Sequence, residues 1–182
     1  NLFSMIASHD ASARSAALIT LANMCALGAL PVGSLRSEAA LAALATMASD
    51  NPQASADHTQ RAAAVALIAQ AAQDASSRAQ LAERGVPALL AVAIAAPDAS
   101  ASGSDVDDTV GAALSWGRDG AVRRNATMAL AHFAADDSLR KDLVAWGALA
   151  PLATQLTPST QPDARTRAMA LSALANFSFV DA

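Results

Sequence analysis

The chain has 182 residues, of which 53% are hydrophobic and 3% are aromatic, and its formal net charge is −4. This composition supplies enough apolar surface for a folded core, so the chain is not disordered throughout. The basic residues are scattered, without the basic face and interleaved aromatics that nucleic acids require, and the longest apolar stretch, residues 86–96, is too short to span a membrane.

Hydrophobic periodicity, interrupted by Gly, Pro and short polar residues, predicts helices through the first half of the chain. Asp10 precedes the first of them and Gly28 follows it. Gly85 permits a sharp turn before Pro87, which suits the first turn of a helix because no N–H is needed there. The expected helices run from Asp10-Ala11-Ser12 to about 27, over 34–48 and 54–73, from the polar break 74–77 to Arg84, and onward from Pro87.

The same order of elements returns in the second half. Residues 136–138 begin a short helix that ends at Trp146, and Gly147 turns the chain into the next helix, 148–156. A break at 158–162 then leads into a long helix over 163–179. Between the halves lies a Ser/Asp/Gly-rich insert, 98–117, that the pattern does not require.

Four of the predicted helices share one register, opening with Arg and closing on Leu or Ile, Ala and a polar residue. They open at Arg14, Arg61, Arg123 and Arg167, so successive units are 47, 62 and 44 residues apart. The long interval contains the insert, and without it the three intervals are similar. Such spacing is typical of a helical repeat protein.

These segments resemble armadillo repeats. Leu81–Leu90 and Leu143–Leu152 are similar to the family's turn between first and second helices, and Arg124–Phe133 and Arg167–Phe177 are similar to its third helix. The resemblance covers nearly the whole chain except the insert. It implies an all-α fold, a right-handed α-solenoid of armadillo-type three-helix repeats, with HEAT repeats as the nearest alternative.

In the armadillo frame the chain holds about three complete repeats after the end of a partial one. The first complete repeat departs most from the family pattern, because Ala39 stands where the turning glycine would be. The expected divisions are 1–27 for the partial repeat, then 28–73, 74–135 with the insert 98–117, and 136–182. No signal peptide is visible, and we expect the chain to be part of a longer polypeptide.

The polar residue that closes each unit is expected on one face of the solenoid. At about 100° per residue, Leu21 lies about 160° around its helix from Asn23, so that one side is core and the other faces outward. Stacked repeats would align these outward positions along a concave wall. The candidate protein-binding residues on this wall are Ile19, Asn23, Gln70, Asn125, Met128, His132, Ser172 and Asn176.

A ladder of amides suits an extended peptide, because each Asn or Gln offers the peptide backbone both a donor and an acceptor. In armadillo families the same side chains also bond to neighbouring backbone and brace the stack, so both interpretations stay open. Nuclear-import adaptors of similar fold carry Trp four residues before the Asn, where this chain has Ile19, Ala66, Met128 and Ser172. The sequence therefore does not predict a classical nuclear-import adaptor.

The resemblance implies a non-catalytic protein–protein interaction scaffold, a section of a larger armadillo-repeat protein that binds partners through its concave groove and open solenoid ends. The alternative is a receptor for an extended peptide, such as a cargo or trafficking adaptor. We expect a cytoplasmic location, in a cytoskeletal or ciliary axonemal assembly, because proteins of this kind resemble trafficking and central-pair components. No cofactor or small-molecule substrate is expected.

The insert offers a further candidate contact, because its end turns apolar at Val110, Leu114 and Trp116. A loop on a scaffold often carries function, but a surface excursion with Trp116 packed on the solenoid accounts for the same pattern.

Other sites find little support in the sequence. The histidines, His9, His58 and His132, lack the spacing of a zinc site, and the aspartates at 105, 107 and 108 lack that of an EF-hand. Cys25 is the single cysteine and lies in an apolar helix, which favours a buried small side chain over a nucleophile. No catalytic motif is present, so the sequence does not predict an enzyme.

Overall fold

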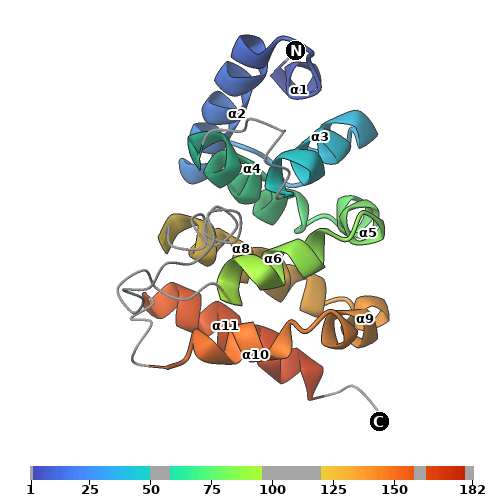
Figure 1. The fold of residues 1–182 in the computed structure, drawn as a ribbon, viewed down its shortest axis with the longest axis vertical. Coiled ribbons are helices and arrows are strands. Elements are labelled where there is room, and N and C mark those ends of the chain that lie inside the picture. Colours follow the sequence, from blue (N-terminus) through green and yellow to red (C-terminus); the bar gives the residue numbers. More distant parts are fainter. Residues whose placement is uncertain (1, 50–57, 96–119, 158–162, 179–182) are drawn as a thin grey trace, which may run out of the picture. The chain divides into compact units, whose positions relative to one another are not determined.

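The computed structural model describes residues 2–49, 58–95, 120–157 and 163–178. Throughout these residues the regular elements are helices, and none is a strand. The chain divides into two compact units, residues 1–86 and 87–182. Figure 1 shows the helices of each unit. The predicted all-α class is confirmed.

The first unit contains five helices among its described residues: α1 (Leu2–Met5), α2 (Ala11–Ala26), α3 (Glu38–Ala48), α4 (His58–Ala71) and α5 (Ala75–Glu83). Helix α2 packs against α4, α3 packs against both α4 and α5, and α1 contacts α2 and α3. The core is built from Leu and Ile at helical spacing, such as Leu18 and Leu21 on α2 and Leu41 and Leu44 on α3.

The second unit begins within the first turn of α6 (Val86–Ala95) and continues with α8 (Gly120–Ala134), the 3-10 helix η3 (Asp137–Leu139), α9 (Arg140–Ala145), α10 (Leu149–Thr154) and α11 (Ala164–Phe177). Helix α8 packs against α11, α9 and η3, and α10 packs against α11. Among the residues that the structure describes, Phe133 on α8 is the largest side chain that is fully buried.

The predicted order of short helix, glycine turn, middle helix and long helix is confirmed. It occurs as α5, Gly85, α6 and α8, and again as η3 with α9, Gly147, α10 and α11. Gly85 and Gly147 have φ of 71° and 76°, in the left-handed region where a side chain would be strained. This is the element order of an armadillo-like solenoid, whose right-handedness and repeat boundaries stay predictions.

The first complete repeat lacks a first helix. Residues 28–37 form turns, with φ of 79° at Gly33, and α3 begins at Glu38 rather than at the predicted Ser34. It then runs through Ala39 without a break, which is why no turning glycine is needed there. The predicted polar break at 74–77 is also wrong, because α5 already begins at Ala75.

A short local motif starts the helices. Asp10, Asp74, Asp136 and Asp163 are N-caps, and each carboxylate accepts backbone N–H groups two or three residues further on. Each is followed by Arg at the fourth position, and in three cases this Arg donates back to a carbonyl oxygen two residues before the Asp. These bonds are Arg14 to Ser8, Arg78 to Ala72 and Arg140 to Ala134, each 2.9 Å long.

The pattern Asp-x-x-x-Arg occurs six times in the sequence, the remaining copies being 57/61 and 119/123. In these two copies the Asp lies outside the described residues. The motif places an Asp before every Arg that opens a unit. Sequence reasoning used Asp10 and residues 136–138 as helix starts but missed the constant spacing between Asp and Arg. The motif gives α2, α5, η3 and α11 a local start signal, whereas α3 begins after Ser37 and α10 after Ala148.

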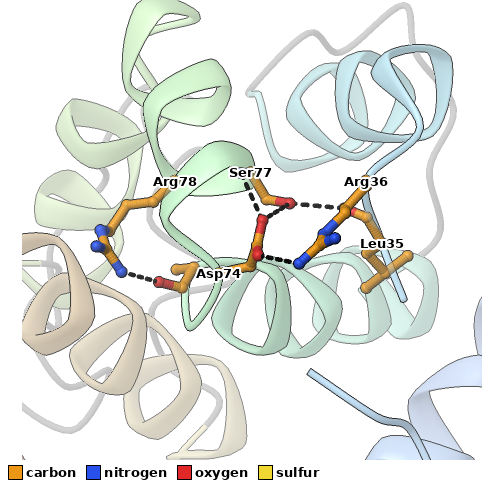
Figure 2. Close-up of polar contacts among 6 residues, drawn as sticks. Leu35, Arg36, Asp74, Ser77 and Arg78 are labelled. Carbon is orange, nitrogen blue, oxygen red and sulfur yellow. Dashed lines mark hydrogen bonds and ion pairs between the residues drawn. The ribbon is translucent and has the colours of Figure 1, made fainter. Parts of the chain in front are cut away.

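A polar network fixes the segment that replaces the missing helix (Figure 2). The hydroxyl of Ser77 donates to the carbonyl oxygen of Leu35 over 3.0 Å, and the Ser77 backbone N–H donates to the carboxylate of Asp74, also over 3.0 Å. The guanidinium of Arg36 lies 2.7 Å from the same carboxylate. Asp74 therefore caps α5 and anchors residues 35–36 at once, and these contacts keep its pKa below the usual value, the Ser77 N–H contributing most.

Candidate functional site

The second unit places five of the predicted residues on two neighbouring helices. Asn125, Met128 and His132 share one face of α8 at spacings of three and four residues, and Ser172 and Asn176 share one face of α11. Ser172 is exposed and the other four are half-buried. We call these five residues the α8–α11 face.

The opposite side of these helices is core, as the register predicted. Leu130 is buried on α8, while its counterpart Leu174 on α11 is half-buried. Met169, three residues before Ser172, occupies the position of Asn125 on α8 and is also half-buried. Sequence reasoning missed Met169, although its spacing of three and seven residues from Ser172 and Asn176 was a visible signal.

The amide groups of this face are available. Within the part of the chain that the structure describes, the side chains of Asn125 and Asn176 make no hydrogen bond. Both are only half-buried, so water satisfies them until a ligand replaces it. A donor and an acceptor on each of two packed helices are thus offered to a partner.

The first unit places the other three predicted residues on the packed helices α2 and α4. Ile19 and Asn23 are exposed on α2. Gln70 on α4 is half-buried, and its amide nitrogen donates to the carbonyl oxygen of Leu30 over 2.9 Å. Gln70 therefore braces the turn segment 28–37 within its own unit.

The amide oxygen of Gln70 is also engaged. It accepts hydrogen bonds from the amide nitrogen of Gln73 at 2.9 Å and from the thiol of Cys25 at 3.6 Å. Cys25 is half-buried, and burial raises the pKa of its thiol, so the thiol stays protonated at neutral pH. This fits a small packing residue better than a nucleophile.

These hydrogen bonds predict that Gln70 contributes to the stability of the fold, whereas Asn23 does not. Gln70→Ala should lower the free energy of unfolding by about 1–3 kcal/mol, because it leaves the carbonyl of the buried Leu30 without the amide donor of Gln70. Asn23→Ala, on an exposed surface, should change it by less than about 0.5 kcal/mol. Denaturant unfolding followed by circular dichroism measures both, and equal losses would contradict the bracing role.

An ion pair links the two helices of the α8–α11 face. The guanidinium of Arg124 on α8 lies 3.0 Å from the carboxylate of Asp163, the N-cap of α11. The pKa of Asp163 is lowered to about 2, mainly because its carboxylate accepts the backbone N–H of Thr166 and then because of Arg124. Asp163 holds the start of α11 against α8.

The lowered pKa predicts acid sensitivity. A carboxyl whose folded pKa lies below its unfolded value contributes stability above the unfolded value, near 4, and this contribution is lost as the pH falls towards 2. Unfolding curves of the wild type and of Asp163→Asn, which keeps a capping oxygen but no charge, should therefore converge between pH 5 and pH 2. A stability difference that is constant over this range would show that the charge of Asp163 contributes nothing.

The remaining predicted contacts are not tested. Val110, Leu114 and Trp116 lie outside the described residues, as do the aspartates at 105–108. Among the residues that are described, no group of three or more His, Cys, Asp or Glu side chains could hold a metal ion. None of the described helices has the length and apolar character needed to cross a bilayer.

Comparisons with known proteins bear on the fold. No protein-family model and no curated protein matches the sequence. Among solved structures, a crystal structure of an engineered protein is similar over 97% of this chain, with a TM-score of 0.67 and 20% sequence identity, and the chain spans 36% of that protein's length. A designed armadillo repeat protein also matches, over 99% of this chain and 82% of its own, with a TM-score of 0.46 and 20% identity. The first match shows that the helical fold is shared with a solved structure, and the order of elements described above is what makes this fold armadillo-like.

Proposed function

We propose that the chain is a non-catalytic scaffold that binds other proteins through the α8–α11 face, as a section of a multi-protein assembly in the cytoskeleton or the ciliary axoneme. The armadillo-like fold suggests protein binding, because stacked helices offer an extended surface, and such solenoids are typically non-catalytic. The observation that carries the proposal is the pair of uncommitted amides, Asn125 and Asn176, on helices joined by the Arg124–Asp163 pair. A rigid support with unpaired polar groups is what a specific interface needs.

Site-specific photo-crosslinking tests the scaffold. A photoreactive amino acid placed at Ser172, the exposed residue of the face, should give discrete adducts with other proteins in the source cell. The matched control places the same photoreactive amino acid at Ser76, which is exposed on α5. If neither Ser172 nor any other position of the face gives adducts, the scaffold proposal is wrong. Mass spectrometry identifies the crosslinked proteins and so tests whether the assembly is cytoskeletal or axonemal.

The second candidate function is a receptor for an extended peptide, and the free amides favour it specifically. Neighbouring packed helices lie about 8–10 Å apart, and Asn176 stands seven register positions, about 10 Å, further along its helix than Asn125. An extended chain advances about 3.3 Å per residue, so it would meet the two amides about four residues apart. Asn125 and Asn176 could then each satisfy both backbone groups of one peptide residue.

Selection of random linear peptides on the wild-type chain tests this candidate. Enriched peptides should bind the double variant Asn125→Ala, Asn176→Ala at least about tenfold more weakly, and the control Ser76→Ala unchanged. Peptides that bind the double variant as well as the wild type would exclude the receptor and leave the scaffold standing.

A further inference from the structure

The two helices that carry the α8–α11 face are basic within an acidic chain. Helices α8 and α11 together contain four arginines and no Asp or Glu, whereas the net charge of the chain is −4. Two of these arginines stand beside the face, because Arg124 precedes Met128 by four residues and Arg165 precedes Met169 by four. Both arginines are exposed. We call Arg124 and Arg165 the basic edge.

The fold does not require a charge at the position of Arg165. On the counterpart helices α2, α4 and α8, this register position carries Ser12, Thr59 and Ala121. Ala121 stays partly exposed although α11 packs against α8, so the position belongs to the face and not to the side that a neighbouring helix covers. A charge that the packing does not need is free to recognise a partner.

The basic edge keeps unused hydrogen-bond donors. Asp163 is the carboxylate that lies against it, and this group accepts the backbone N–H of Thr166 over 2.8 Å and one N–H of Arg124 over 3.0 Å. Within the described residues, the other N–H groups of Arg124 and the whole guanidinium of Arg165 make no hydrogen bond. Two guanidinium groups thus face one carboxylate, which leaves an excess of positive charge with open donors.

From this charge we infer that the partner of the α8–α11 face is an acidic protein segment, whose Asp or Glu carboxylate binds Arg165 and shares the open donors of Arg124. The inference rests on the proposed function and names the chemistry of the partner. A guanidinium can hold a carboxylate through two parallel N–H···O bonds.

The rest of the face fits a protein segment better than a polynucleotide. Met128 and Met169, both half-buried, offer apolar contact next to the arginines, and the amides of Asn125 and Asn176 suit a peptide backbone. None of the described residues of the face is Phe, Tyr or Trp, on which nucleic-acid bases stack.

Charge reversal in the full chain tests the inference. Photo-crosslinking from Ser172 is repeated with Arg165→Glu and with the matched control Arg167→Glu, which makes the same charge change about 200° around the same helix. Arg165→Glu should lower the adduct yield at least about tenfold, and Arg167→Glu less than about twofold, with circular dichroism showing that both chains are folded. Ala121→Arg removes no existing charge contact and should raise the yield, which keeps the test valid if Arg165→Glu folds poorly.

The crosslinked segment supplies the second half of the test. Arg165 stands seven residues, about 10 Å, before Ser172, and an extended chain advances about 3.3 Å per residue, so Asp or Glu should occur within about five residues of the crosslink. A synthetic copy of the segment with these acids replaced by Asn or Gln should bind the chain at least about tenfold more weakly.

The outcomes separate this inference from the proposed function. If the yield ignores both Arg165→Glu and Ala121→Arg, or if the neutralised copy binds as well as the original, the partner is not recognised by its acids and the scaffold still stands. Loss of adducts after phosphatase treatment would replace the carboxylate by a phosphate and overturn the inference alone. Adducts with nucleic acid only, or no adducts from any position of the face, would defeat both.

Discussion

Replacing Leu18 with Ala should lower the free energy of unfolding of the first unit by about 2–5 kcal/mol. Leu18 is fully buried on α2, so the truncation removes apolar contacts and leaves a cavity that packed helices fill only in part. Denaturant unfolding followed by circular dichroism, with hydrogen exchange to assign the loss to the first unit, measures the effect.

Leu171→Ala is the matched control, because Leu171 holds the same register position on α11 but is 55% exposed. It should cost less than about 1 kcal/mol in the isolated chain. A loss as large as that of Leu18→Ala would mean that Leu171 is covered in solution.

Replacing Ser77 with Ala should cost about 1–3 kcal/mol, although it removes a single oxygen atom. Ser77 is 0% exposed, and its hydroxyl is the donor to the carbonyl of Leu35, a residue that is also buried. Without the hydroxyl, the Leu35 carbonyl loses its hydrogen bond from Ser77, and the Asp74 carboxylate loses its hydrogen bond with the Ser77 hydroxyl as well. Thermal unfolding should show a lowered midpoint.

Ser76→Ala provides the comparison for this network. Ser76 is the exposed neighbour on the same turn of α5, and its truncation should change the free energy of unfolding by less than about 0.5 kcal/mol. If the two serine variants unfold alike, the segment 28–37 is held by its apolar contacts and the network is incidental.

Much of the fold could be predicted from local signals. Gly85 and Gly147 marked the turns between short and middle helices because their φ angles are open mainly to glycine. The register that placed Leu21, Ile68 and Leu130 in the core depends only on helical periodicity. Both signals act within a few residues, so neither requires knowledge of the partner element.

The turn segment 28–37 could not be predicted, because its conformation depends on bonds to residues about 40 positions away. The Leu30 carbonyl is satisfied by Gln70, and the Leu35 carbonyl by Ser77. Residues 34–37 have a helical pattern, but these hydrogen bonds stabilise turns there instead of a helix. The use of Gln70 as a brace was likewise invisible, since its local pattern matches that of Asn23, which is exposed.

The sequence also could not predict which register positions are buried by a neighbouring helix. Leu18 and Leu171 occupy one position in one register, yet one is buried and the other is not. Burial is a property of the whole stack, whereas the register describes a single helix. Predicting the α8–α11 face from its amides was therefore possible, while the exposure of Leu171 required the structure.

The Asp-x-x-x-Arg motif bears on how a repeat chain of this kind can gain or lose units in evolution. Since each Asp caps a helix through N–H groups two or three residues further on, this starting signal travels with its segment, although Asp74 and Asp163 also pair with a distant Arg. A gene encoding this chain could gain, lose or lengthen a unit while the remaining units kept their own starting signals. The long stretch at 98–117 lies between two such signals, at Asp74 and Asp119, where growth of the polypeptide disturbs neither.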